Sequence, residues 1–355
     1  MNIPILNLYY LLIYSWDSLE EAELIDVEIE DKTKLVELFG RVLNSGVEHL
    51  LRRGLDRQYL EFKDVIPGIK GKVDLTGSVK QNLRVRARAL CEFDELNHNI
   101  IHNRIIKSTI RLLCKVSDLP KGLKSKLEDT YRRLGGIDEV SLSEKVFRSV
   151  QLHRNIRFYR FLLDVCKMIK DNLFIDEQTG RAKFRDFYRD EKLMRTVFEN
   201  FVRNFYLREQ TVFKVHRDKT PWQKTTGDDQ SLVALPQMKT DVSLTSTSLN
   251  RKIIIETKFS PQVFKKHYEK LSLRSEHLYQ LFSYIMNIAA KGGINKNLEA
   301  ILLYPTAQSE VDLLYEMHGH SVRIFTLNLN QSWEQIHQDL LALLDPSTLR
   351  LQVAD

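Results

Sequence analysis

The chain contains a run of three isoleucines, Ile253 to Ile255, that is followed at once by Glu256-Thr257-Lys258. An unbroken run of β-branched apolar residues predicts a strand that is buried on both faces. Charged residues at the end of such a strand emerge at the sheet edge where functional sites collect. We therefore expect a buried sheet in this half of the chain, with chemistry at one of its edges.

The segment Lys239-Thr240-Asp241-Val242-Ser243-Leu244 is the expected hairpin partner of this strand, with Ser248 and Leu249 at the turn. In that register Asp241 lies directly opposite Glu256, and opposed residues have Cβ atoms about 5 Å apart. Lys258 points the same way as Glu256 because side chains in a strand alternate with period two. One face of the hairpin would then carry two carboxylates and an ammonium group.

Two carboxylates this close repel each other unless a cation compensates them. Mg²⁺, with Mn²⁺ as the alternative ion, suits oxygen ligands and takes only one or two protein carboxylates. A metal ion beside a phosphate supports phosphodiester hydrolysis, and Lys258 would orient the attacking water and stabilise the developing charge. The same spacing also fits an amphipathic hairpin whose charges are simply solvated, but the isoleucine run favours a site.

This set of residues resembles the core of the PD-(D/E)XK nucleases, with Asp241 as the first acid and Glu256-Thr257-Lys258 as the E-x-K element. The resemblance implies Glu199, in the preceding helix, as an acid beside the metal. It also implies Gln280 and Tyr284 as the Q-x-x-x-Y pair of the exonuclease-like branch, and these two share a helical face at i, i+4. A mixed core helix with one polar residue is the alternative for that pair. The implied catalytic residues are Asp241, Glu256, Lys258, Glu199, Gln280 and Tyr284, with Asp241, Glu256 and Glu199 as metal ligands.

Segments across nearly the whole chain also resemble the McrC family, the nuclease subunits of methylcytosine-dependent McrBC restriction systems. They are IPILNLYYLLIYSWD, VIPGIKGKVDL, FDELNHNIIHNRIIKSTI, LPQMKTDVSL, IIIETKF, LYQLFSYI and LLYP. The resemblance implies an AAA+ GTPase motor hexamer of the McrB type as partner and double-stranded DNA carrying modified cytosine as substrate. The chain would dock on the motor through its N-terminal half, stimulate GTP hydrolysis and cut DNA. Glu256 stands where close relatives can carry Asp. The glutamate keeps the same charge on a side chain that is one methylene longer.

The chain has 355 residues, and at about 150 residues per domain this length predicts two domains. We expect an α+β N-terminal adaptor domain over residues 1–172, which binds the motor. An α/β PD-(D/E)XK restriction-endonuclease-like domain should follow over residues 173–355. Residues 3–19 predict a short strand that runs into a helix, and residues 59–90 predict two or three strands. Helical spacing occupies 32–53, 97–115, 121–134, 149–169 and 193–209.

Two basic segments are candidates for contact with the motor or with DNA. Lys80, Arg84, Arg86 and Arg88 would share one face of a strand, either as a partner surface or as the charged protection of an edge strand. Lys265 and Lys266 lie in a loop after the E-x-K element and favour a phosphate contact. The net charge is only +6, which fits a chain that depends on its partner for DNA affinity.

Several other kinds of site are excluded by their spacing. The segment GIKGK, residues 68–72, lacks the P-loop spacing, so GTP would be bound only by the partner. The pairs His98/His102 and His318/His320 lack the surroundings of a zinc site. Three widely spaced cysteines indicate reduced thiols, and the absence of a long apolar stretch indicates a cytoplasmic protein without membrane contact.

Two rival interpretations remain open at this point. The first is an autonomous DNA repair or recombination nuclease that has the same core and needs no motor. The second is a non-catalytic scaffold that only activates the motor. Both retain the two-domain fold. The first differs from the leading hypothesis in that Asp241, Glu256 and Lys258 cut DNA without a motor, and the second in that they do not cut DNA.

Overall fold

The computed structural model divides the chain into two compact units that do not follow chain order. The sheet unit comprises Met1–Leu19 and Asp186–Asp355, and the arm unit comprises Glu20–Arg185. The division expected at residue 172 therefore differs from the one observed, both in its position and in the placement of the first 19 residues. The structure describes residues 3–25, 27, 33–153, 156–175, 182–184, 190–222, 234–260, 264–267, 270–307 and 310–346.

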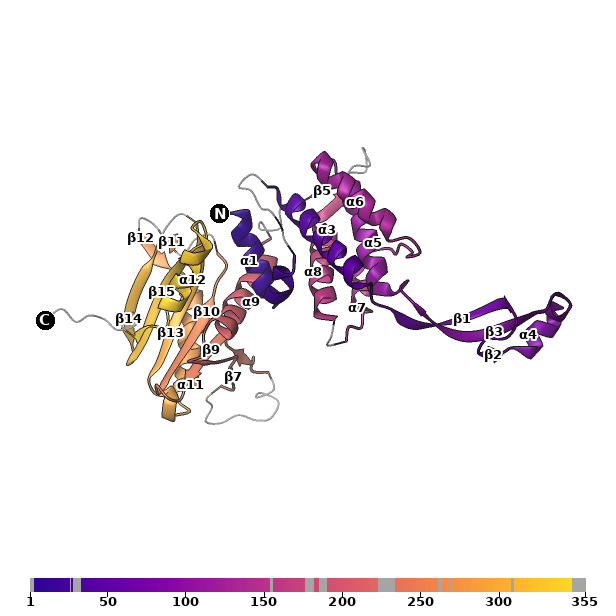
Figure 1. The fold of residues 1–355 in the computed structure, drawn as a ribbon. Helices are drawn as coiled ribbons and strands as arrows, with labels where there is room; N and C mark the ends of the chain where they lie inside the picture. The colour runs from indigo at the N-terminus through magenta and orange to yellow at the C-terminus, as the bar shows by residue number, and fades with distance from the viewer. Residues whose placement is uncertain are drawn as a thin grey trace. The chain divides into compact units, whose positions relative to one another are not determined.

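The sheet unit is built on a mixed six-stranded sheet with the order β14-β15-β13-β10-β9-β6 (Figure 1). β13 runs parallel to β10 and β15, whereas the other pairs are antiparallel. The strands are β6 (Lys214–His216), β9 (Val242–Ser246), β10 (Arg251–Thr257), β13 (Leu298–Thr306), β14 (Asp312–Met317) and β15 (His320–Asn328). Two hairpins accompany the sheet: β7 (Lys219–Thr220) with β8 (Met238–Lys239), and β11 (Phe264–His267) with β12 (Lys270–Leu273).

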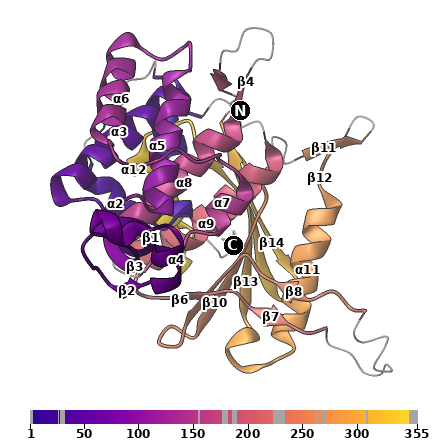
Figure 2. The same cartoon turned by 90° about the vertical axis from the view of Figure 1, so that its right-hand side faces the viewer.

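Among the described residues, the sheet unit also contains four helices and one 3-10 turn. They are α1 (Ile5–Ser15), α9 (Glu191–Glu209), α11 (Ser275–Ala289), η4 (Gly293–Asn295) and α12 (Trp333–Ala342). Figure 2 shows α11 running alongside β13, where Leu281, Ile285 and Ile288 join the core formed with Ile254 and Leu302. None of the helices that the structure describes is long and apolar enough to cross a membrane.

Residues 3–19 form helix α1 followed by a turn, so the short strand expected within them is wrong. Helix α1 begins directly after Pro4 and buries its apolar residues against α9. The Asn204 side chain of α9 donates to the Tyr14 carbonyl at 2.8 Å, and the Tyr14 hydroxyl donates to Glu209 at 2.7 Å. Asn7 donates to the Leu329 carbonyl at 2.9 Å. These contacts explain why the start of the chain belongs to the sheet unit.

The arm unit combines a helical body with a long ribbon of β1 (Gln58–Pro67) and β3 (Arg88–Asn97), to which the short strand β2 (Lys72–Val73) adds on the β3 side. The body contains α2 (Leu19–Glu23, at the junction of the units), α3 (Leu35–Arg53), α5 (Ile101–Cys114), α6 (Lys121–Arg133), α7 (Glu144–Arg148), α8 (Arg157–Asn172), β4 (Leu173–Ile175) and β5 (Ala182–Phe184). The ribbon pairs β1 with β3 along their full length. Figure 1 shows the ribbon extending away from the helices of its own unit.

The tip of this ribbon corrects the expected basic strand. Residues between β1 and β3 form β2 (Lys72–Val73), helix α4 (Leu75–Lys80) and the 3-10 turn η1 (Leu83–Arg86). Asp74 caps α4 by accepting from the Gly77 amide at 2.8 Å, and Ala87 has a positive φ of 52°. A strand cannot continue through a capped helix and a left-handed residue. Lys80, Arg84, Arg86 and Arg88 therefore do not share a strand face.

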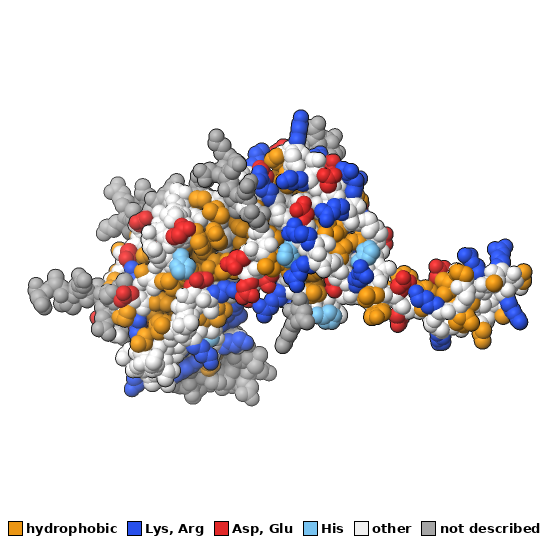
Figure 3. All heavy atoms as spheres, viewed as in Figure 1, with side chains coloured by type: hydrophobic (Ala, Val, Ile, Leu, Met, Phe, Trp, Pro, Cys, Tyr) orange, Lys and Arg blue, Asp and Glu red, His pale blue; other side chains and the backbone are white. Residues whose placement is uncertain are grey.

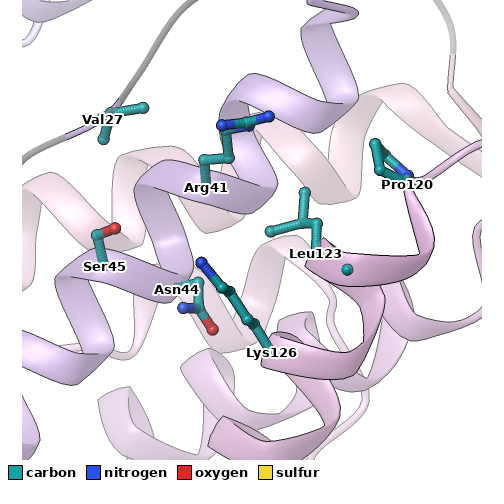
Figure 4. A pocket seen from close by; sticks show the side chains of 8 residues that line it. Val27, Arg41, Asn44, Ser45, Pro120, Leu123 and Lys126 are labelled. Carbon is teal, nitrogen blue, oxygen red and sulfur yellow. The ribbon is translucent and has the colours of Figure 1, made fainter.

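A cavity of about 480 Å³ lies between α3 and α6 of the arm unit (Figure 4). Arg41, Asn44 and Ser45 line it from α3, and Leu123 and Lys126 line it from α6. On its α3 wall, Arg41 is bound to Glu37 and Asn44 accepts from the Thr130 hydroxyl at 2.8 Å. The Asn44–Thr130 bond thus links the two helices, whereas the Arg41–Glu37 pair lies within α3.

Candidate functional site

The β9–β10 hairpin has the register that the sequence predicts. Val242 pairs with Ile255 and Ser246 with Arg251, and the turn closes with a bond from the Asn250 amide to the Thr247 carbonyl. One further step in this register sets Asp241 opposite Glu256. The three isoleucines of β10 are at most 1% exposed. The strand is therefore buried on both faces, and its polar residues emerge at its carboxyl end as expected.

Four of the predicted catalytic side chains form one hydrogen-bonded cluster at this end. Lys258 Nζ and Gln280 Nε2 each donate to Glu256 Oε1 at 2.7 Å. Lys258 Nζ also donates to Gln280 Oε1 at 2.7 Å, and Gln280 Nε2 donates to the Tyr284 hydroxyl at 2.9 Å. Helix α11 thus presents Gln280 and Tyr284 from one face toward the end of β10, in agreement with their spacing.

Asp241 lies immediately before β9 and is fixed by the residue between Glu256 and Lys258. Its Oδ2 accepts from the Thr257 amide at 2.9 Å and from the Thr257 hydroxyl at 2.8 Å. Both bonds go to one oxygen, so Oδ1 remains for another ligand. The hairpin therefore positions the Asp241 carboxylate without depending on the Lys258 cluster.

Glu256 is a buried acid that keeps its proton unusually well. Burial, followed by the charge of Asp241, raises the pKa of Glu256 to about 8, although Lys258 opposes the shift. The residue is 2% exposed, and its Oε2 is a buried oxygen without a hydrogen-bond partner among the described residues. A buried carboxyl oxygen without a partner is costly. Glu256 Oε2 is therefore available to bind a further ligand.

Glu199 reaches the edge of the site from α9, where an arginine holds it. Arg217 Nη2 donates to Glu199 Oε1, and Arg217 Nε donates to the Asp241 carbonyl at 3.2 Å. Burial and the charge of Asp241 raise the pKa of Glu199, while Arg217 acts in the opposite direction. Glu199 is thus close enough to interact with Asp241, but it is engaged in an ion pair.

Arg217 was not predicted from the sequence, because the strand before it has only three residues and gives little signal. It follows β6, and the antiparallel pairing of β6 with β9 brings residues 217 and 218 to the same sheet end as Asp241. Behind it, Asp218 contacts Lys252 Nζ at 2.8 Å, and its amide donates to the Thr240 hydroxyl at 2.9 Å. Burial alone would raise the pKa of Asp218, but hydrogen bonds from His216 and Lys252 hold it well below its usual range.

Residues 7–305 match the model of the family described as McrBC 5-methylcytosine restriction system component. The chain belongs to this family. It is 33% identical over 343 residues to the type IV methyl-directed restriction enzyme EcoKMcrBC of Escherichia coli strain K12, an alignment that covers 97% of each chain. The resemblance to the McrC family that the sequence suggests is thereby confirmed.

A solved structure supports the same overall fold. It is a refined half-complex from an assembly of Thermococcus gammatolerans McrB AAA+ hexamers with bound McrC. The TM-score is 0.58 at 15% identity, over 96% of this chain and 76% of the matched one. At this level of identity the likeness concerns the fold alone.

In this McrBC-family chain two carboxylates, rather than three, fit a divalent ion. The described residues contain no group of three or more His, Cys, Asp or Glu side chains that could hold a metal. Mg²⁺ needs only one or two carboxylates because it retains several waters. Glu256 Oε2 and Asp241 Oδ1, which have no protein donor within the described residues, are suitable oxygen atoms. Glu199 is bound to Arg217, and its role as a metal ligand stays a prediction.

The remaining predicted contacts lie away from this cluster. Lys265 and Lys266 belong to β11, but their side chains fall outside the part of the chain that the structure describes. Lys80, Arg84, Arg86 and Arg88 belong to the arm unit of this family member.

Proposed function

We propose that the chain is the Mg²⁺-dependent endonuclease subunit of a modification-dependent restriction complex, and that its sheet unit is a PD-(D/E)XK nuclease. The observation that carries this proposal is the Glu256–Lys258–Gln280 cluster at the end of a buried strand, beside Asp241. A solvated amphipathic hairpin would leave its charges exposed, whereas Glu256 is 2% exposed. Burying a carboxyl group with one oxygen left without a hydrogen-bond partner is unfavourable, which favours a site that binds a ligand there.

In this proposal Asp241 and Glu256 would hold the metal ion through Oδ1 and Oε2. When bound, Mg²⁺ would lower the pKa of a water molecule and neutralise charge on the phosphate. The protein's own part begins with Asp241, which the Thr257 amide and hydroxyl hold in one orientation. Glu256 is oriented by its bonds from Lys258 and Gln280.

Lys258 is the group that would act on the phosphate directly. Its ammonium is held by Glu256 Oε1 and Gln280 Oε1, each at 2.7 Å. Those two bonds leave the third proton of the ammonium for a phosphate oxygen or the attacking water. A fixed positive charge at the reacting phosphate stabilises the charge that develops during in-line attack. Gln280 and Tyr284 act through Lys258 and Glu256 as positioning residues.

The arm unit would dock on an AAA+ GTPase of the McrB type and stimulate its GTP hydrolysis. The tip of the ribbon carries large apolar side chains that are strongly exposed: Ile69 (77%), Leu75 (72%), Val79 (71%) and Val85 (85%). Figure 3 shows hydrophobic and basic side chains together at the end of the arm. Exposed apolar clusters rimmed by charge mark protein interaction sites. GTP would be bound by the partner alone, and the substrate would be duplex DNA that carries modified cytosine.

The deciding experiment measures cleavage of DNA containing 5-methylcytosine by the chain with its McrB-like partner, GTP and Mg²⁺. We expect cleavage only in the complete mixture, and we expect Asp241→Asn to abolish cleavage while GTPase stimulation persists. Cleavage without the partner would favour an autonomous nuclease. Full cleavage by the complex with Asp241→Asn would favour a non-catalytic scaffold.

A further inference from the structure

A basic cavity of about 330 Å³ adjoins the Lys258 cluster within the sheet unit. It is lined by Glu191, Arg195, Lys258, Phe259, Ser260, Arg274, His277 and Gln280. Lys258 and Gln280 therefore face both the proposed reaction centre and this cavity. The other polar walls come from Ser260, from the first two turns of α9 and from the start of α11.

The charges of the lining residues favour an anion. Three permanent cations, Arg195, Lys258 and Arg274, face one carboxylate, Glu191. Lys258 forms an ion pair with Glu256 at 2.7 Å, and Arg274 forms an ion pair with Glu276 at 3.5 Å at the protein surface. Surface ion pairs of this kind contribute little, so the contact with Glu276 does not prevent Arg274 from binding a stronger anion.

His277 gives a second indication of the positive potential in the cavity. Its Nδ1 is hydrogen bonded to the buried hydroxyl of Tyr304 at 2.8 Å. Burial, then the charges of Lys258, Arg274 and Arg195, lower the pKa of His277 to about 4. The imidazole is consequently neutral at neutral pH. In the tautomer whose Nδ1 accepts from the Tyr304 hydroxyl, the neutral imidazole carries its proton on Nε2, where it is a donor.

We propose that this cavity binds a backbone phosphodiester of the strand that is cut, next to the scissile phosphate, with Arg195 and Arg274 as the residues that hold it. Arginine suits this ligand because its planar guanidinium donates two hydrogen bonds to one phosphate. Successive phosphates of a strand are only about 3.4 Å apart along the duplex axis. A phosphate at the Lys258 cluster therefore brings its neighbour to the adjoining cavity.

The two arginines set the register of the strand on the site. Arg195 comes from α9 and Arg274 precedes α11, so a phosphate bound by both is fixed relative to two elements of the site. Phosphate contacts position nucleic acid without reading its sequence. Base recognition is therefore left to other parts of the complex. This inference rests on the proposed function, since it assigns the ligand of a cavity beside the proposed reaction centre.

The test is the affinity of the full-length chain for duplex DNA, measured in chelator by fluorescence anisotropy at several salt concentrations. Each protein–phosphate contact contributes about 0.9 to the slope of log affinity against log salt. We expect Arg195→Gln and Arg274→Gln each to weaken binding about tenfold and to lower that slope by about 0.9. Lys296→Gln is the matched control, because it removes an equal charge from an exposed site beyond the far end of α11.

Two DNA forms distinguish the sources of the phosphate. Closed circular DNA offers only internal phosphodiesters, whereas linear DNA with 5′-phosphates also offers terminal phosphate groups. The proposal requires the loss of affinity and slope on circular DNA. A loss confined to 5′-phosphorylated ends would overturn it in favour of a terminal-phosphate site, and competition by inorganic phosphate would support that result.

Three other outcomes overturn the proposal: unchanged slopes in both arginine variants, an equal effect of Lys296→Gln, or no salt-dependent binding by the wild type. The assay needs no catalysis, so its result is separate from that of the Asp241→Asn cleavage experiment. If Asp241→Asn abolishes cleavage while the arginine variants bind normally, the proposed function stands and the cavity assignment fails. If instead the complex with Asp241→Asn cuts normally and the arginine variants lose affinity and slope, the cavity binds DNA in a chain that does not itself cut.

Discussion

Thr257 binds Asp241 twice, through its backbone amide at 2.9 Å and through its hydroxyl at 2.8 Å, and both bonds end on Oδ2. This residue lies between Glu256 and Lys258, so the middle position of the E-x-K element orients the first acid. The other carboxylate oxygen of Asp241 is thereby directed to a ligand. A hydroxyl at this position is expected to matter for catalysis more than for folding.

The first prediction concerns this hydroxyl. Thr257→Val retains the backbone bond to Asp241 and removes the side-chain bond, which should cost about 1 kcal/mol of stability. We expect kcat for DNA cleavage to fall about tenfold, the equivalent of about 1.4 kcal/mol, with KM for DNA unchanged. Thr245→Val is the matched control, because the Thr245 hydroxyl is buried without a hydrogen-bond partner among the described residues. An equal loss of kcat in both variants would contradict the role assigned to Thr257.

The second prediction concerns Lys258. Lys258→Met keeps the length of the side chain and removes the ammonium that Glu256 and Gln280 hold. Losing one preorganised group of this kind typically costs about 100-fold or more in kcat. We expect cleavage by the assembled complex to fall by that factor while GTPase stimulation is retained. Lys296→Met serves as control, and cleavage at the wild-type rate by Lys258→Met would exclude Lys258 from the chemistry.

The sequence predicted the parts of the site that depend on strong local patterns. The isoleucine run located β10, the hairpin register paired Val242 with Ile255, and the i, i+4 spacing brought Gln280 and Tyr284 to one face. Each follows from the period of a strand or a helix. Arg217 was missed because it reaches the site through the pairing of β6 with β9, which a short strand of three residues hardly signals.

Two wrong predictions have a common physical cause. Residues 80–88 alternate in polarity like a strand, but Asp74 caps a helix and Ala87 adopts a left-handed conformation. Residues 3–19 mix two periods, and packing of α1 against α9 decides in favour of the helix. In both segments a specific cap or a tertiary contact outweighs the local pattern. The placement of the first 19 residues in the sheet unit also follows from such contacts, since no pattern reports that Asn204 binds the Tyr14 carbonyl.

The third prediction is a pH dependence of stability that originates in Glu256. The pKa of this residue is about 8 in the folded chain, against an ordinary value of 4.5. Between these values the folded state holds a proton that the unfolded state has released. The free energy of unfolding therefore falls as pH rises through this window, by at most about 1.4 kcal/mol per pH unit. The stabilisation is fully present below the ordinary pKa and is lost above about pH 8.

Thermal unfolding in chelator measures this effect. We expect the wild-type Tm to fall from about pH 5 to about pH 8, and Glu256→Gln to show a shallower fall because it has no proton to release. Glu334→Gln, at an exposed position of α12, should keep the wild-type slope. Identical slopes in the wild type and Glu256→Gln would show that Glu256 titrates normally. Mg²⁺ should also bind more tightly as pH approaches 8, since ligand carboxylates must be deprotonated.

The fourth prediction separates the two units by function. Val85 is 85% exposed at the tip of the arm, so Val85→Asp should change the free energy of unfolding by no more than about 0.5 kcal/mol. If the tip contacts the motor, a charge there must be desolvated in the interface. We expect assembly with the McrB-like partner and its GTPase stimulation to weaken at least tenfold, with cleavage lost as a consequence.

Val212→Asp provides the control for this prediction, because Val212 is 55% exposed in the sheet unit and the exchange adds the same charge. Light scattering measures assembly, and phosphate release from GTP measures stimulation. Salt-dependent DNA binding by Val85→Asp alone should match the wild type, since the cavity between Arg195 and Arg274 belongs to the other unit. Normal GTPase stimulation by Val85→Asp would show that the motor is engaged by another surface of the chain.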